Sequence, residues 1–297
     1  MMNKRFHNLI LNFNLTNIRL HFNKSKVYPF SFPEFLTAKD QKAQTATMLK
    51  RSVWEHMTYG GYPKVVTTSE NEMKRIILLD LYETMLFKDI SRTFSIQDLA
   101  ALERFVRYLA AGVGALLSYQ KVSNELNISF QTIKKYLDAM EKSYLVVPVR
   151  PFFTNKKKEL IKQPRYYFLD TGLRNAIARS FDTEPDGALF ENYVLSELVK
   201  MGLSPRYWRT KAKAELDFIV ERKGGIIPVE VKLKALPGKI ERSLRSFIST
   251  YEPEMAVVVS YRGETGTTRV GGCEVVFVDI PGLWKTLGPE SVTYKKG

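Results

Sequence analysis

Two carboxylates and a lysine lie on neighbouring segments in the C-terminal half of the sequence. Asp217 lies in Glu215-Leu-Asp-Phe-Ile-Val220, and the other two lie in Pro228-Val-Glu-Val-Lys232. Carboxylate oxygens are the ligands that Mg²⁺ and Mn²⁺ prefer in proteins. A cation held there polarises a phosphoryl oxygen and lowers the pKa of a bound water. Lys232 can orient that water or neutralise developing charge, so these residue types predict a site for phosphodiester hydrolysis.

The glycines between the two segments predict how these side chains face. Gly224-Gly225 between two apolar runs is a strong hairpin signal. A two-residue turn there predicts these cross-strand pairs: Arg222 with Ile227, Ile219 with Glu230, and Asp217 with Lys232. Opposed residues share a face and side chains alternate along a strand. We therefore expect Asp217, Glu230 and Lys232 to project from one face of a sheet.

A further carboxylate for such a site commonly comes from a preceding helix, and Glu191 in Leu189-Phe-Glu-Asn192 is the natural candidate. The predicted metal ligands are thus Glu191, Asp217 and Glu230, with Lys232 as a fourth catalytic residue and Mg²⁺ or Mn²⁺ as the cofactor. The histidines His7, His21 and His56 show no metal-ligand spacing.

The elements that must position these residues form a mixed α/β pattern from residue 182 onward. Periodicity and turn signals predict helices at 188–202, 239–251 and 281–287, and strands at 205–210, 215–222, 226–233, 255–261 and 274–280. This order, with Asp217 on the second strand and Glu230-x-Lys232 on the third, resembles the PD-(D/E)XK nuclease superfamily. The resemblance implies a restriction-endonuclease-like core at 182–297.

The preceding part of the chain predicts helices and then a small helix-turn-helix unit. Two prolines predict an extended segment at 27–38, and apolar spacing predicts helices at 41–58, at 70–90 and after Ser95. From residue 118 to 181 the order is helix, turn, helix, strand, basic loop, strand, which is typical of a winged helix-turn-helix whose second helix contacts DNA. The predicted nucleic-acid contacts are Lys134, Lys135, Lys156, Lys157 and Lys158. A basic helical scaffold that docks another protein is the alternative.

The charge balance supports a polyanionic partner. The net charge is +14 and the sequence pI is about 9.6, and excess Lys and Arg attract nucleic acid, here expected to be duplex DNA, with an anionic membrane surface as the rival. No stretch approaches the roughly 20 apolar residues of a membrane span. Cys273 is the only cysteine, which fits a reducing cytoplasm.

Several further motifs occur in the order seen in a large prokaryotic family of AAA-type ATPases that carry a C-terminal domain of unknown function 4143. The matching motifs are Pro29-Phe-Ser-Phe-Pro-Glu-Phe35, Gly60-Gly-Tyr-Pro63, Lys88-Asp-Ile-Ser-Arg92, Ser129-Phe-Gln-Thr132, Leu169-Asp-Thr-Gly-Leu173, Glu191-Asn192 and Glu215-Leu-Asp-Phe218. The resemblance implies that 27–117 is a helical remnant of an ATPase lid and linker. The P-loop pattern G-x-x-x-x-G-K-S/T does not occur in this sequence, so ATP hydrolysis is not expected.

The sequence therefore predicts an α+β protein in four parts. These are an unassigned segment at 1–26, the helical region at 27–117, the winged helix-turn-helix at 118–181 and the nuclease-like domain at 182–297. The predicted function is a divalent-metal-dependent DNA-binding protein with a nuclease core. The alternative is a non-catalytic DNA-binding or protein-interaction module derived from the ATPase family.

Overall fold

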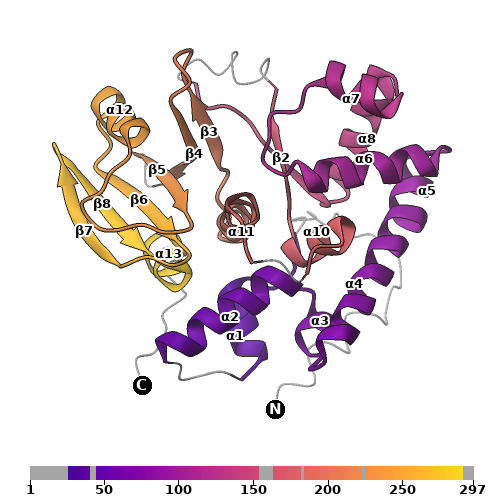
Figure 1. The fold of residues 1–297 in the computed structure, drawn as a ribbon, viewed down its shortest axis with the longest axis horizontal. Coiled ribbons are helices and arrows are strands. Elements are labelled where there is room, and N and C mark those ends of the chain that lie inside the picture. Colours follow the sequence, from indigo (N-terminus) through magenta and orange to yellow (C-terminus); the bar gives the residue numbers. More distant parts are fainter. Residues whose placement is uncertain (1–25, 41–44, 154–162, 182–183, 223–224, 290–297) are drawn as a thin grey trace, which may run out of the picture.

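The computed structural model describes residues 26–40, 45–153, 163–181, 184–222 and 225–289. Helices occupy most of the N-terminal half, and a six-stranded mixed sheet lies in the C-terminal half (Figure 1). The predicted α+β class is confirmed at this level. None of the described helices is long and apolar enough to cross a membrane.

The N-terminal half of the described chain is a set of short and medium helices. They are α1 (Phe32–Ala38), α2 (Ala46–Tyr59), α3 (Pro63–Val66), α4 (Asn71–Thr84), the π-helical turn η2 (Met85–Ile90), α5 (Ser91–Thr93) and α6 (Leu99–Ala111). The single helix predicted at 70–90 is thus interrupted by a π-helical turn. Such turns arise where the i→i−4 hydrogen-bond ladder is locally displaced.

The extended conformation predicted for 27–38 is wrong for most of that segment, because α1 begins at Phe32. Pro33 lies in the first turn, where a missing backbone N–H leaves no helical hydrogen bond unmade. Ser31 and Glu34 form a capping box, in which the Glu34 carboxylate accepts from the Ser31 backbone N–H at 2.8 Å. This pattern of Ser followed three residues later by Glu was the available signal for a helix start.

The middle of the chain has the predicted order of elements. Its helices are α7 (Tyr119–Leu126) and α8 (Phe130–Lys142), and its strands β1 (Val146–Val149) and β2 (Arg165–Phe168) pair antiparallel before α10 (Thr171–Ala178). Asn127 adopts a left-handed conformation between the helices, and Ser129 caps α8 by accepting from the Thr132 N–H. Asp170 caps α10, because its side chain accepts from the Leu173 N–H.

The C-terminal sheet has the order β3-β4-β5-β6-β8-β7. Its strands are β3 (Arg206–Arg209), β4 (Glu215–Arg222), β5 (Gly225–Lys232), β6 (Met255–Ser260), β7 (Gly266–Val270) and β8 (Cys273–Val278). The pairs β5/β6 and β6/β8 are parallel, and the other neighbours are antiparallel. The sequence did not predict β7, an edge strand whose residues are half-buried or exposed.

Helices cover both faces of this sheet. One core joins α11 (Gly187–Lys200) and α13 (Ile280–Leu287) to residues such as Phe218, Val229 and Val257. A second core joins α12 (Arg242–Tyr251) to residues such as Ile219 and Val258 on the opposite face. The first core continues into α1, α2 and α6, so α11 lies between the sheet and the helical region (Figure 1).

The register of the central hairpin differs from the prediction by two residues. Arg222 pairs with Gly225, and Ile219 pairs with Pro228, because Gly225 is the first residue of β5 rather than part of the turn. A shift of one residue would have moved every side chain to the other face, whereas a shift of two preserves the faces. The predicted faces are therefore unaffected by the wrong register, and the hairpin does bring the side chains of Asp217, Glu230 and Lys232 close together.

Candidate functional site

Asp217, Glu230 and Lys232 lie together at one end of the β4–β5 hairpin. The Asp217 carboxylate accepts a hydrogen bond from the Val231 backbone N–H at 2.7 Å. Lys232 Nζ lies 2.7 Å from Glu230 Oε1. The hairpin thus brings together the three residues that the sequence singled out, with Asp217 held to the backbone of the strand that carries the other two.

Glu191 approaches this group from α11. That helix is capped by Asp186, whose side chain accepts from the Leu189 N–H. The hydroxyl of Tyr167 donates to Glu191 Oε1 at 2.5 Å, and Arg165 Nη1 lies 3.8 Å from the same oxygen. A carboxylate of α11 is therefore directed toward β2, at the edge of the acidic group.

Arg165, Tyr167 and Glu215 are members of this site that the sequence did not predict. The Arg165 side chain is only 8% exposed, and it forms ion pairs with both Glu191 and Glu215. Its guanidinium also lies over the Tyr207 ring, at 4.8 Å from the centroid. The available signals were an arginine within the aromatic strand Arg165-Tyr-Tyr-Phe168 and a glutamate two residues before Asp217, which alternation places on the same side of β4.

The electrostatics of the site disfavour full ionisation of its acids. Burial, followed by the charge of Asp217, raises the pKa of Glu191 to about 7 and the pKa of Glu230 to about 7. Burial also raises the pKa of Asp217. Burial opposes the charge of Lys232, but its hydrogen bond with Glu230 and the charges of the surrounding acids together raise the pKa of the lysine. Like charges brought together in this way favour a cation between them.

Glu191, Asp217 and Glu230 have the ligand atoms that a divalent cation prefers, but their side chains are not arranged around one position. All three candidate ligands supply carboxylate oxygens, and Glu230 Oε2 is buried without a hydrogen-bond partner. Among the residues with described positions, however, no three His, Cys, Asp or Glu side chains are already arranged to hold a metal ion. Glu191 is held instead by Tyr167 and Arg165, so it would have to turn toward Asp217 to join a shared site.

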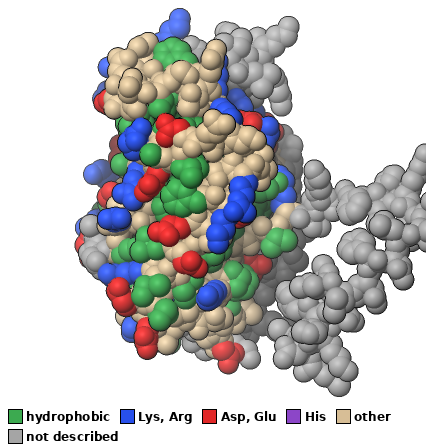
Figure 2. Space-filling model, turned by 90° about the vertical axis from the view of Figure 1, so that its right-hand side faces the viewer, with side chains coloured by type: hydrophobic (Ala, Val, Ile, Leu, Met, Phe, Trp, Pro, Cys, Tyr) green, Lys and Arg blue, Asp and Glu red, His purple; other side chains and the backbone are tan. Residues whose placement is uncertain are grey.

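Two of the five lysines predicted to contact nucleic acid lie in the described part of the chain. Lys134 and Lys135 are exposed on α8, and Lys135 Nζ donates to the Ser95 carbonyl at 2.9 Å. Lys156, Lys157 and Lys158 lie outside the described residues, as does the segment 1–25. The face of the helical region in Figure 2 mixes acidic, basic and hydrophobic side chains. Because this face has no uniform positive charge, a polyanion bound there would be held by individual lysines.

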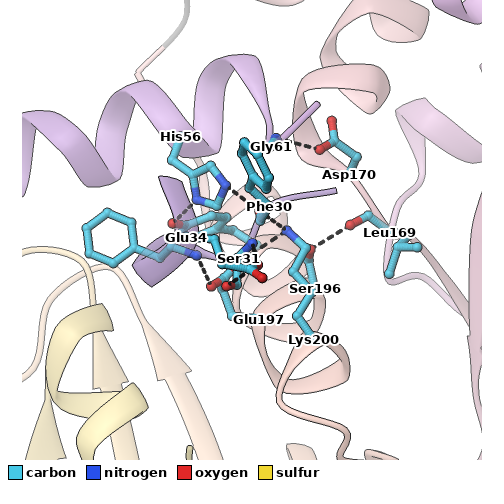
Figure 3. Close-up of polar contacts among 12 residues, drawn as sticks. Phe30, Ser31, Glu34, His56, Gly61, Leu169, Asp170, Ser196, Glu197 and Lys200 are labelled. Carbon is cyan, nitrogen blue, oxygen red and sulfur yellow. Dashed lines mark hydrogen bonds and ion pairs between the residues drawn. The ribbon is translucent and has the colours of Figure 1, made fainter. Parts of the chain in front are cut away.

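A second polar cluster lies between α1, α2, α11 and α13 (Figure 3). Glu197 is fully buried, and its Oε2 accepts from the Phe32 N–H and from Trp284 Nε1, each at 2.8 Å. Its Oε1 lies 3.1 Å from Lys200 Nζ, which also donates to the Phe30 carbonyl. All the polar groups of this cluster named here are paired, which is typical of a structural network rather than a reaction centre.

His56 belongs to the same cluster and has a structural role. Its Nε2 lies 2.9 Å from the Phe30 carbonyl, and its Nδ1 lies 2.8 Å from the Tyr193 hydroxyl. Burial, followed by the charge of Lys200, lowers the pKa of His56 well below its usual range. The neutral ring with the proton on Nε2 satisfies both contacts, since a carbonyl can only accept.

Two regions of the chain match protein families, and they adjoin close to the start of α11. Residues 50–184 match a domain of unknown function (DUF8612), and residues 186–281 match a domain of unknown function (DUF4143). The resemblance to the second family is therefore confirmed for the region that carries Glu191, Asp217, Glu230 and Lys232. Neither family description states a reaction.

Similar proteins occur in bacteria and archaea. An uncharacterized protein of Haemophilus influenzae is 30% identical over 263 residues, which cover 85% of this chain and 63% of the relative. An uncharacterized protein of Mycobacterium tuberculosis is 30% identical over 214 residues, covering 69% of this chain and 48% of the relative. One from Methanocaldococcus jannaschii is 24% identical over 219 residues, with coverage of 69% and 48%. The chain thus spans between about half and two thirds of the length of these relatives.

Proposed function

We propose that this protein is a nuclease that uses Mg²⁺ or Mn²⁺, with a PD-(D/E)XK core at 182–297. The observation that carries the proposal is the group formed by Asp217, Glu230 and Lys232 at the end of one hairpin, with the charge of Asp217 raising the pKa of both neighbouring glutamates. Buried acids that repel one another reduce stability and are typical of functional sites. The position of Glu191 on the preceding helix also fits that superfamily.

The proposed ligands are Glu191, Asp217 and Glu230. A bound Mg²⁺ or Mn²⁺ supplies polarisation of the phosphoryl oxygen and a lowered pKa of bound water. The chain itself contributes Glu230 Oε2, which is buried and unpartnered, and Asp217, which the Val231 N–H orients. Lys232 is 37% exposed, so its ammonium can reach a phosphate and neutralise developing charge there.

The test of this proposal is cleavage of plasmid and linear DNA by the purified chain. We expect cleavage with Mg²⁺ or Mn²⁺ and none with EDTA, because carboxylates alone repel a phosphate. A metal titration followed on gels gives the measurement. Binding of DNA without cleavage under any divalent metal would contradict the nuclease proposal.

The segment 118–181 is proposed to act as a winged helix-turn-helix that holds duplex DNA. The support is the element order, the antiparallel β1/β2 pair and the exposed Lys134 and Lys135 on α8. In such units the second helix enters the major groove, while basic residues contact phosphates. The charge of +14 for the whole chain favours the same class of partner.

Replacing Lys134 and Lys135 by alanine is expected to weaken duplex binding for every sequence tested. Each lost phosphate contact should lower the slope of log K against log salt by about 0.9. Fluorescence anisotropy between about 50 and 200 mM salt measures this slope, with the exposed Lys50 and Lys64 of α2 and α3 replaced in a matched control. An unchanged slope would remove α8 from the interface. Replacing Lys156, Lys157 and Lys158 tests the loop in the same assay.

A non-catalytic DNA-binding or protein-interaction module is the second candidate. It is favoured by the ion pairs of Arg165 with Glu191 and Glu215, because a guanidinium already balances part of the negative charge that a metal would balance. The absence of a ready three-ligand group among the described residues points the same way. The cleavage assay decides between the two candidates.

A further inference from the structure

A hollow of about 320 Å³ opens beside Glu230, between the end of β5 and the start of α12. The residues around it that matter here are Glu230, Lys232, Lys234, Leu236, Lys239 and Glu241. Larger hollows of about 710 and 590 Å³ lie elsewhere and are not lined by Asp217, Glu230 or Lys232. Of these three hollows, the smallest is therefore the one that adjoins the candidate site.

The lining combines three lysines with two glutamates, Glu230 and Glu241, and an apolar wall. Lys232 lies against Glu230, whereas Lys234 and Lys239 are exposed on the segment that joins β5 to α12. Leu236, between them, is 43% exposed. Burying such a side chain under an apolar ligand surface removes it from water, which is favourable. An anion with an attached ring system would satisfy both parts of this lining.

The size of the hollow limits what can enter it. A volume of about 320 Å³ is at the lower end of the range for small-ligand sites, roughly 300–1,000 Å³. It suits one nucleotide and is too small for a base pair with its two backbones. A base within a duplex can enter such a pocket only after unpairing, and this cost is smallest for a base that is already single-stranded.

We propose that this hollow binds one unpaired nucleotide next to the phosphate that is cleaved. Lys234 and Lys239 bind its phosphate, and Leu236 contacts its base or sugar. This inference rests on the proposed function and narrows its substrate class. The preferred substrate is a duplex with a single-stranded end, in which the paired part lies on the winged helix-turn-helix and the unpaired part reaches the hollow.

The experiment compares two fluorescent DNA hairpins of the same stem, one with a flush end and one with a four-nucleotide overhang. Binding is measured by anisotropy in EDTA, so that no cleavage occurs. The wild-type protein is expected to bind the overhang hairpin about tenfold more tightly. The variant Lys234→Glu/Lys239→Glu should lose this preference, and its salt slope for the overhang should fall by about 0.7 per lysine.

The matched control is Lys50→Glu/Lys64→Glu, which changes the charge by the same amount at exposed positions on other helices. This control variant should still bind the overhang hairpin more tightly than the flush hairpin. Equal binding of the two hairpins by the wild-type protein, or a preserved preference in the Lys234/Lys239 variant, would overturn the proposal. Because binding is read without metal, a lost preference in that variant supports the nucleotide site even if the cleavage assay fails.

Discussion

Replacing Glu197 by alanine is expected to lower the free energy of unfolding by about 3–5 kcal/mol, the range measured when one partner of a buried ion pair is removed. The side chain is fully buried, and both of its oxygens have partners. Alanine would leave Lys200, which is 4% exposed, without its counter-charge. It would also leave the Phe32 N–H and the Trp284 indole N–H without an acceptor, and each unpaired buried donor adds its own desolvation cost.

Chemical denaturation followed by tryptophan fluorescence measures this loss as a lower midpoint with an unchanged slope. Glu221→Ala is the matched control, because Glu221 is 55% exposed and pairs with Arg206 at the surface, where an ion pair contributes about 1 kcal/mol or less. Adding Lys200→Met to Glu197→Ala should restore part of the stability, since the unpaired ammonium is removed. A loss below about 1 kcal/mol for Glu197→Ala would show that the cluster in Figure 3 is not a determinant of the fold.

Glu197 also shows where prediction from sequence stopped. The helix that carries it was predicted within two residues of its observed bounds, because its apolar positions recur at helical spacing. Its partners Phe32 and Trp284 are 165 and 87 residues away, and no local pattern relates them. A glutamate that shares the apolar side of a helix is a signal of a buried partner, but it does not identify that partner.

The candidate site shows the same division between local and long-range information. Strand alternation and the glycine turn predicted that Asp217, Glu230 and Lys232 share a face, even though the register was wrong by two residues. The contacts of Arg165 and Tyr167 with Glu191 depend on how β2 packs against α11. That packing is tertiary, so the sequence predicted the acids and the lysine but missed the arginine that balances them.

Replacing Asp217 by asparagine is expected to reduce the rate of metal-dependent cleavage by about a hundredfold or more. Even outer partners of metal ligands commonly account for 10- to 100-fold in metal affinity or activity, and a ligand should account for at least as much. Asparagine keeps the size of the side chain and an oxygen that can still accept from the Val231 N–H. The change therefore removes the negative charge with little effect on the backbone.

The same substitution should leave duplex binding intact, because the proposed contacts of the helix-turn-helix lie on α8 and the protein becomes more positive. It should also not lower the melting temperature. The charge of Asp217 raises the pKa of both Glu191 and Glu230, so its removal relieves repulsion among buried acids in the metal-free protein. If the variant is stable and binds DNA but does not cleave it, the loss of cleavage comes from the lost metal ligand and not from unfolding.

We measure three properties of the same preparations: cleavage rates with saturating Mg²⁺, melting temperature, and DNA binding by anisotropy. Glu221→Gln is the matched control, since it removes a carboxylate from the same strand at an exposed position. This control should cleave at the wild-type rate. Unchanged cleavage by Asp217→Asn would place the reaction at another site or in a contaminating enzyme, because Asp217 is a proposed ligand whose charge acts on both Glu191 and Glu230.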